Sequence, residues 1–227
     1  FKQKTAYEIK ECDWSSDVCS SDLTLRESLK LLESQGVLER RPGPGGGIIV
    51  REPSIDLLAH GLSVFLRLHE VPFSTVLQAR EVIEPALAQA AAISGTEAHF
   101  AELAASIARM KALDAQRDQD TFLEENRVFH SIIARAGGNK VLEVFWNTIS
   151  VLAAGEHHGI RYSVGNQTHV VKAHQRILDA CRCRDGAAAA AEMETHVGAL
   201  ENLVRQRYQH LLKHPTSVFE RPGRLIA

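Results

Sequence analysis

The chain has 227 residues, and its 28 acidic side chains nearly balance its 26 lysines and arginines, giving a formal net charge of −2. This balance provides no global positive field for nucleic acid, so any DNA-binding surface has to be local. The hydrophobic fraction is that of an ordinary globular protein. No run of residues approaches the 18 or so consecutive apolar positions of a membrane helix, so no membrane association is expected.

Residues 1–23 differ in character from the rest of the chain. The segment DWSSDVCSSDL (13–23) is one reading frame of a common short-read sequencing adaptor, and FKQKTAYEI (1–9) similarly translates the companion primer. We therefore expect residues 1–23 to be an adaptor-derived artefact that is excluded from fold reasoning, with a natural N-terminal extension as the alternative. About 200 residues then remain, enough for one substantial domain and a small one.

Residues 24–51 are expected to form a helix followed by a hairpin. Leucines at helical spacing predict a helix over 24–35, and Gly36 is a helix-ending residue. A short strand over 37–41, a proline- and glycine-rich turn over 42–47 and a returning strand over 48–51 follow. A helix followed by a two-stranded wing is the second half of a winged helix-turn-helix, whose recognition helix lies in the major groove of DNA.

Positive and flexible residues of this unit are candidates for DNA contact. A guanidinium near the start of the helix can reach a guanine edge or a phosphate, and arginines beside the wing can neutralise phosphates. Glycines at the tip let the main chain approach the duplex closely. The candidates are Thr24, Arg26, Arg40, Arg41, Gly45 and Gly46. The alternative is an ordinary surface helix and hairpin with solvated arginines.

The stretch TLRESLKLLESQGVLERRPGPGGGIIV (24–50) resembles the end of the DNA-binding domain of GntR-superfamily transcription regulators. The resemblance implies DNA contacts by Thr24 and Arg26 and a wing formed by Arg41 and residues 43–47. The first two helices of that domain, and the Ser-Arg step before its recognition helix, are not found in this sequence. Because a recognition helix needs those helices as its platform, we expect the chain as written to bind DNA poorly or not at all.

A linker over 52–54 precedes a region, 55–213, that is helical almost throughout. Turn-forming residues separate expected helices near 55–69, 74–94, 97–116, 119–136, 139–157, 166–183 and 187–213. Short connections imply antiparallel neighbours in a bundle. Residues 214–227 carry two prolines and are expected to be a loose tail. The expected fold is therefore mostly α, a partial winged helix-turn-helix followed by an all-helical antiparallel bundle.

Cys181 and Cys183 are the two cysteines that follow residue 23. Alternate positions on a helix point apart, so they are a poor disulfide pair. Free thiols fit a reducing cytoplasm, which is the expected location, and metal ligation is the alternative.

Four polar side chains lie on otherwise apolar helical stripes: Asn126, His130, His174 and His196. Polar groups that face a core must be paired or coordinated. Three imidazoles and an amide oxygen from three helices could converge on one divalent transition metal, with zinc or nickel expected first. The alternative for each histidine is a hydrogen-bonded core residue.

Five further stretches resemble, in order, the FCD effector domain of FadR-type GntR regulators: REVIEPALA (80–88), FLEENRVFH (122–130), AGGN (136–139), HQRILDA (174–180) and HVGAL (196–200). The resemblance spans about residues 55 to 212. It implies a metal site formed by the three histidines and by Asn126, at a position where metal-binding members carry Asp. A neutral amide oxygen is a weaker ligand than a carboxylate.

Arg80 is the candidate for binding the carboxylate of a small organic-acid effector, since an arginine fork pairs carboxylate bidentately. The alternative is a surface salt bridge with Glu84 at i+4. The predicted function is a ligand-responsive, sequence-specific regulator that acts as a homodimer on twofold operator DNA, and not an enzyme. The rivals are a metal-dependent helical-bundle enzyme and a stand-alone ligand-binding module without a DNA role.

Overall fold

The computed structural model describes residues 19–43, 46–114, 117–154 and 160–213. The chain divides into two compact units, residues 1–58 and 59–227, and each unit is described by itself. Among the described residues, no helix is both long enough and apolar enough to cross a membrane.

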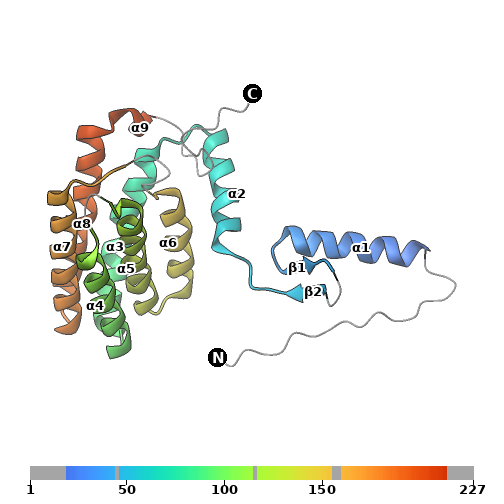
Figure 1. Cartoon of the computed structure of the whole chain (residues 1–227), viewed down its shortest axis with the longest axis horizontal. Helices are drawn as coiled ribbons and strands as arrows, with labels where there is room; N and C mark the ends of the chain where they lie inside the picture. Colours follow the sequence, from blue (N-terminus) through green and yellow to red (C-terminus); the bar gives the residue numbers. More distant parts are fainter. Residues whose placement is uncertain (1–18, 44–45, 115–116, 155–159, 214–227) are drawn as a thin grey trace. The chain divides into compact units, whose positions relative to one another are not determined.

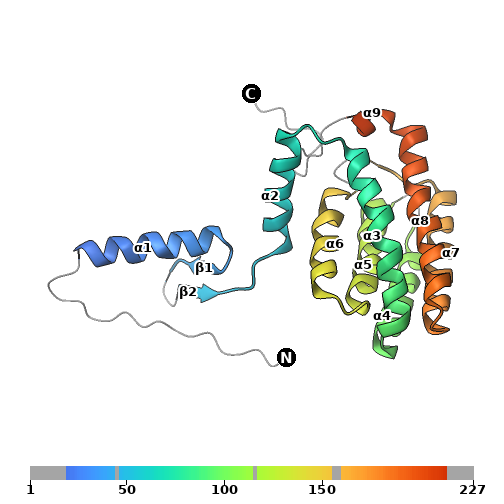
Figure 2. The same cartoon turned by 180° about the vertical axis from the view of Figure 1, so that it is seen from behind.

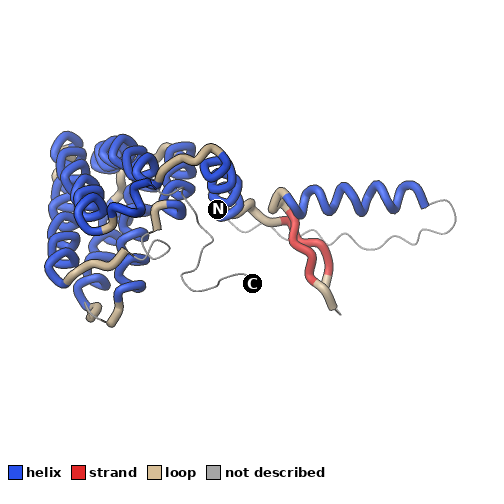
Figure 3. Tube along the Cα trace, turned by 90° about the horizontal axis from the view of Figure 1, so that it is seen from above, coloured by secondary structure: helices blue, strands red, loops and turns tan. Residues whose placement is uncertain are grey.

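The first unit contains α1 (Cys19–Ser34), β1 (Leu38–Arg41) and β2 (Gly47–Val50). The strands form an antiparallel hairpin in which Leu38 pairs with Val50 (Figure 3). Gly36 ends the helix in the left-handed region at φ 71°, where glycine is tolerated best. The predicted helix and hairpin are confirmed, but α1 begins five residues before residue 24, because neither glycine nor proline interrupts the preceding turn. The origin of residues 1–23 stays a prediction.

The second unit is an all-helical bundle whose first helix, α2 (Ile55–Leu68), begins before the boundary between the units. The other helices are α3 (Phe73–Ser94), α4 (Glu97–Ala112), α5 (Gln119–Ala136), α6 (Lys140–Leu152), α7 (Val164–Arg182), α8 (Gly186–Arg207) and α9 (Gln209–Lys213). Helices α3 to α8 lie side by side with similar axis directions (Figures 1 and 2). Short connections and side-by-side helices confirm the predicted bundle.

A large apolar core joins these helices. Leu87 of α3, Phe100 of α4, Phe129 of α5, Trp146 of α6 and Ile177 of α7 are each no more than 2% exposed. Burial of side chains of this size is the main favourable contribution to folding. Helix α3 also contains Pro85, which has no N–H to donate to the carbonyl of Glu81 one turn earlier.

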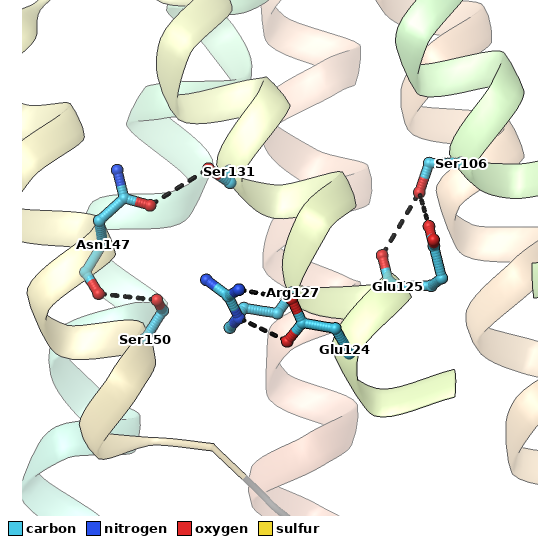
Figure 4. Close-up of polar contacts among 7 residues, drawn as sticks. All are labelled: Ser106, Glu124, Glu125, Arg127, Ser131, Asn147 and Ser150. Carbon is cyan, nitrogen blue, oxygen red and sulfur yellow. Dashed lines mark hydrogen bonds and ion pairs between the residues drawn. The ribbon is translucent and has the colours of Figure 1, made fainter. Parts of the chain in front are cut away.

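Polar contacts tie neighbouring helices together at the flanks of this core (Figure 4). Ser106 of α4 donates to the Glu125 carboxylate of α5 at 3.2 Å. Ser131 of α5 donates to the side-chain oxygen of Asn147 of α6 at 3.1 Å. Glu124 pairs with Arg127 one turn along α5 through two hydrogen bonds. The first two contacts join α5, the helix that carries Asn126 and His130, to α4 and α6.

Three predicted helix ends are wrong. Helix α4 ends at Ala112 rather than 116, because Leu113 adopts an extended backbone. Helix α6 ends at Leu152 rather than 157, with residues 155–157 outside the described part. The helix expected over 187–213 is divided at Tyr208, whose hydroxyl accepts a hydrogen bond from the backbone N–H of Arg161 at 3.0 Å. Helical periodicity in the sequence does not predict a tertiary contact of this kind.

Candidate metal centre and adjoining cavity

Three histidines from three helices converge in the second unit. Nε2 of His196 on α8 lies 3.1 Å from Nε2 of His130 on α5 and 3.1 Å from Nε2 of His174 on α7. One nitrogen from each ring lies within 4.8 Å of the other two. The convergence that the helical register predicted is therefore present in the structure.

Aromatic packing holds two of these rings in place. His174 stacks on Phe129 with a centroid separation of 3.7 Å and an interplanar angle of 8°. His130 lies parallel to Trp146 at 6.0 Å. Both histidines are buried, so their rings cannot turn outward without disrupting the apolar core around them.

A buried carboxylate contacts His130 at its second ring nitrogen, Nδ1. Glu84 of α3 contacts Nδ1 of His130, and both side chains are 1% exposed. Arg80, one turn earlier on α3, donates from Nε to the other oxygen of Glu84 at 2.5 Å. Arg80 and Glu84 thus form a buried pair and not the surface salt bridge considered from sequence. A carboxylate on Nδ1 keeps the proton there and leaves the Nε2 lone pair free for a metal.

Burial and mutual proximity shape the charge states of this cluster. Burial, together with the charge that His130 can carry, lowers the pKa of His196 to about 3. Burial, together with His196 and His130, also holds the pKa of His174 well below its ordinary value. Burial alone would raise the pKa of Glu84, but Arg80 and His130 lower it overall. His174 and His196 are thus neutral imidazoles, and the carboxylate of Glu84 is ionised.

The donor atoms fit a transition-metal ion. With the proton of His130 on Nδ1, its Nε2 is a lone pair that faces the Nε2 atoms of the other rings. A single ring nitrogen of His196 cannot donate to two neighbours at once. Asn126 Oδ1 and His174 Nδ1 are buried and have no hydrogen-bond partner. Three imidazole nitrogens and an orphaned amide oxygen are the kind of set that zinc or nickel accepts.

A cavity of about 310 Å³ adjoins the histidines. It is bordered by His196 and Asn126, by Arg80 and Arg176, and by apolar side chains of α7 and α8. Tyr162 also borders it, and burial raises the pKa of this phenol to about 12, so it remains a neutral hydrogen-bonding group. The volume of the cavity is at the lower end of the range for small-molecule sites, about 300 to 1,000 Å³.

The residues predicted for DNA contact lie in the first unit. Thr24 and Arg26 are exposed on α1, and Arg40 and Arg41 are exposed on β1. At Gly46, an added Cβ would lie 2.1 Å from the carbonyl oxygen of Arg41, so the turn admits only glycine. Gly45 lies outside the described residues. The helix and hairpin thus bring the candidates into one unit, while their contact with DNA stays a prediction.

Sequence reasoning missed two residues of the second unit. Glu84 was considered only as a partner for Arg80, although its neighbours at i+3 and i+4, Leu87 and Ala88, are core residues and place it on the buried stripe of α3. Arg176 was not singled out at all. It lies two residues after His174 and pairs with Glu192 of α8 at 2.6 Å.

Comparison with known proteins agrees with this architecture. A model of the FCD domain matches residues 75–199. The HTH-type transcriptional regulator LutR of Bacillus subtilis is 25% identical over 185 residues, which cover 79% of this chain and 83% of LutR. The solved structure of Streptococcus agalactiae GntR has a TM-score of 0.60 at 21% identity, covering 81% of this chain and 85% of that one. The structure of Lar, which controls the expression of the Listeria monocytogenes agr system, has a TM-score of 0.50 at 13% identity, covering 86% and 89%.

The fold and these relatives define a class of transcription regulators rather than enzymes. Within that class, the chain belongs to the GntR family, as a member with an FCD domain.

Proposed function

We propose that this regulator is a metal-dependent sensor of a small organic acid. His130, His174 and His196 hold a divalent transition metal, zinc or nickel, with Asn126 as a fourth, weaker ligand. A bound metal of this kind supplies open positions for an effector carboxylate, and Arg80 pairs with that carboxylate from the wall of the cavity. The protein acts as a homodimer in the cytoplasm, and effector binding changes its affinity for twofold operator DNA.

The convergence of three Nε2 atoms in front of a buried carboxylate is the observation that carries this proposal. Three core histidines that served packing alone would each pair separately with a nearby backbone or side-chain group. Here the three Nε2 atoms face one another instead, while Nδ1 of His130 pairs with Glu84, and Asn126 Oδ1 adds an unpartnered acceptor. A cation satisfies all four atoms at once.

Elemental analysis of protein loaded with zinc or nickel and then desalted tests the metal site. We expect stoichiometric metal in the unmodified chain and loss of it in His174→Ala and in His196→Ala. His210→Ala is the matched control, because that histidine is exposed on α9. Equal metal in all four proteins would refute the site, and circular dichroism checks that the variants remain folded.

We propose that α1 and the hairpin contact operator DNA through Thr24, Arg26, Arg40, Arg41 and the glycine-rich tip with Gly45 and Gly46. Two leucines of α1, Leu25 and Leu31, are 57% and 60% exposed, although leucines at this spacing ordinarily pack on partner helices. Because a recognition helix needs such packing to hold its angle in the groove, we expect only weak, salt-sensitive binding by this chain.

Selection from a random duplex library, followed by gel shifts, tests that expectation. Arg26→Ala and Arg41→Ala should reduce binding, whereas Lys30→Ala, at another exposed position of α1, should change it less. Tight, sequence-specific binding by the unmodified chain would contradict the expected weakness. Equal effects of all three substitutions would contradict the assigned contacts.

A further inference from the structure

The cavity beside the histidines contains two guanidinium groups and no carboxylate among the described residues that border it. Arg80 comes from α3 and Arg176 from α7. Their side chains are 10% and 50% exposed, so one guanidinium is buried deep in the wall and the other lies where the cavity meets solvent. Positive groups at two depths of one small cavity favour a ligand with negative charge at two places.

Both arginines are held by their own carboxylate through the same atom. Arg80 donates from Nε to Glu84, and Arg176 donates from Nε to Glu192 at 2.6 Å. No contact of the terminal nitrogens of either group is found among the described residues, so two N–H-bearing ends remain available on each. A guanidinium fixed at Nε presents its terminal nitrogens in a defined direction, which reduces the entropy lost when a carboxylate binds.

The rest of the cavity wall suits a short carbon chain between two charged ends. Val170 and Ala173 of α7 and Val197, Leu200 and Leu203 of α8 provide apolar contacts. Thr195 provides a hydroxyl oxygen that can accept, since its own proton is donated to the carbonyl of Ala191 at 3.0 Å. A cavity of about 310 Å³ admits a molecule of a few carbon atoms.

We propose that the effector of this protein is a small dicarboxylate, with one carboxylate at the histidine cluster and Arg80 and the other on Arg176. This inference rests on the proposed organic-acid sensing and adds the class of acid. Arg176 is the residue that distinguishes a dicarboxylate from a monocarboxylate of the same length. Because Arg176 is partly exposed, its contribution to affinity is limited. We expect the dicarboxylate to bind about tenfold more tightly than the monocarboxylate of the same length.

Calorimetric titration of the zinc-loaded full chain with matched acids tests the proposal. Succinate is compared with butyrate, and glutarate with pentanoate. The two acids of each pair have carbon chains of the same length and differ by one carboxylate. The Arg176→Gln variant should bind the dicarboxylates no better than the monocarboxylates. Since Arg176→Gln leaves Glu192 unpaired near the cavity, the double variant with Glu192→Gln separates loss of the guanidinium from repulsion by the carboxylate.

Arg182→Gln is the control, because Arg182 is exposed on the same helix and does not border the cavity. Equal affinity of the unmodified protein for both members of each pair would overturn the dicarboxylate proposal and leave organic-acid sensing intact. Equal losses for both acids in the double variant would overturn the role of Arg176. Retained zinc with no binding of any acid would overturn the sensing function itself, and this proposal with it.

Discussion

The carboxylate of Glu84 and the Nδ1 atom of His130 meet inside the helical bundle, where both side chains are 1% exposed. An ionised carboxylate in such a place is stabilised only by close positive or N–H-bearing partners, and Arg80 on its other oxygen supplies the charge. The arrangement links Arg80, at the wall of the cavity, to the His130 ring of the histidine cluster.

Substitution of Glu84 by Gln should weaken metal binding. An amide does not favour the Nδ1-protonated form of His130 as a carboxylate does, so Nε2 becomes a poorer ligand. We expect the affinity for zinc to fall about 10- to 100-fold, as is typical for loss of such a supporting group. Competition with a chromophoric chelator measures the affinity. Glu102→Gln, which breaks an exposed pair with Arg135, is the control, and equal affinities in the two variants would argue against the supporting role.

Substitution of Asn126 by Asp should strengthen metal binding. Asn126 Oδ1 is buried and unpartnered, and a carboxylate oxygen in its place is a stronger ligand for a divalent ion. We expect roughly tenfold higher zinc affinity, with lower stability of the metal-free variant, because burial of a carboxylate that is not coordinated costs free energy. Asn147→Asp, at a similarly half-buried position on α6, adds the same charge away from the histidines. If both variants bound zinc as the unmodified chain does, Asn126 would not be a ligand.

Cys181 within α7 and Cys183 directly after its last residue should differ sharply in reactivity. Cys181 is buried, and burial raises the pKa of its thiol to about 11, whereas Cys183 is exposed. Because the thiolate is the reactive form, Cys181 should resist iodoacetamide at any pH well below 11. Peptide mapping after a short treatment at pH about 8 should find the label on Cys183. Equal labelling of both in the folded protein would show that the α7 core opens readily; denaturant provides the positive control.

Replacement of Asp185 by Ala should destabilise the bundle modestly. Asp185 caps α8 by accepting a hydrogen bond from the backbone N–H of Ala188 at 2.9 Å. Loss of a side-chain cap lowers the free energy of unfolding by about 1 kcal/mol. Asp185→Asn retains an acceptor oxygen and should lose much less. Urea titrations of the three metal-free proteins measure these differences, and an equally large loss in the Asn variant would point to charge rather than to the cap.

Much of the bundle and the three histidines could be predicted because helical periodicity is a local property. His174 and His196 each lie between apolar residues at i±3 or i±4, and His130 is bracketed by Phe129 and Ile133, so each was expected on the inner face of its helix. Burial of the first two and the 3.1 Å contacts of all three match that expectation. Helix ends were less predictable where a distant residue decides them, as Arg161 does at Tyr208.

Glu84 and Arg176 could not be assigned in the same way. On sequence alone, Glu84 four residues after Arg80 is typical of a solvated ion pair. Its place behind His130 depends on how α3 packs against α5, which no local pattern encodes. Arg176 is polar among polar neighbours on an amphipathic helix, and only the packing of α7 against α8 reveals that it borders a cavity.

Pro85 makes α3 easier to bend at one turn, because it removes a backbone hydrogen bond there. The missing N–H leaves the carbonyl of Glu81 without its usual partner, at the turn that carries both Arg80 and Glu84. Helices bend most easily at such points, so we expect α3 to bend more readily at the turn that carries Arg80 and Glu84 than elsewhere along its length. Displacement of Arg80 would then change the direction of half of α3 and would not be confined to one side chain.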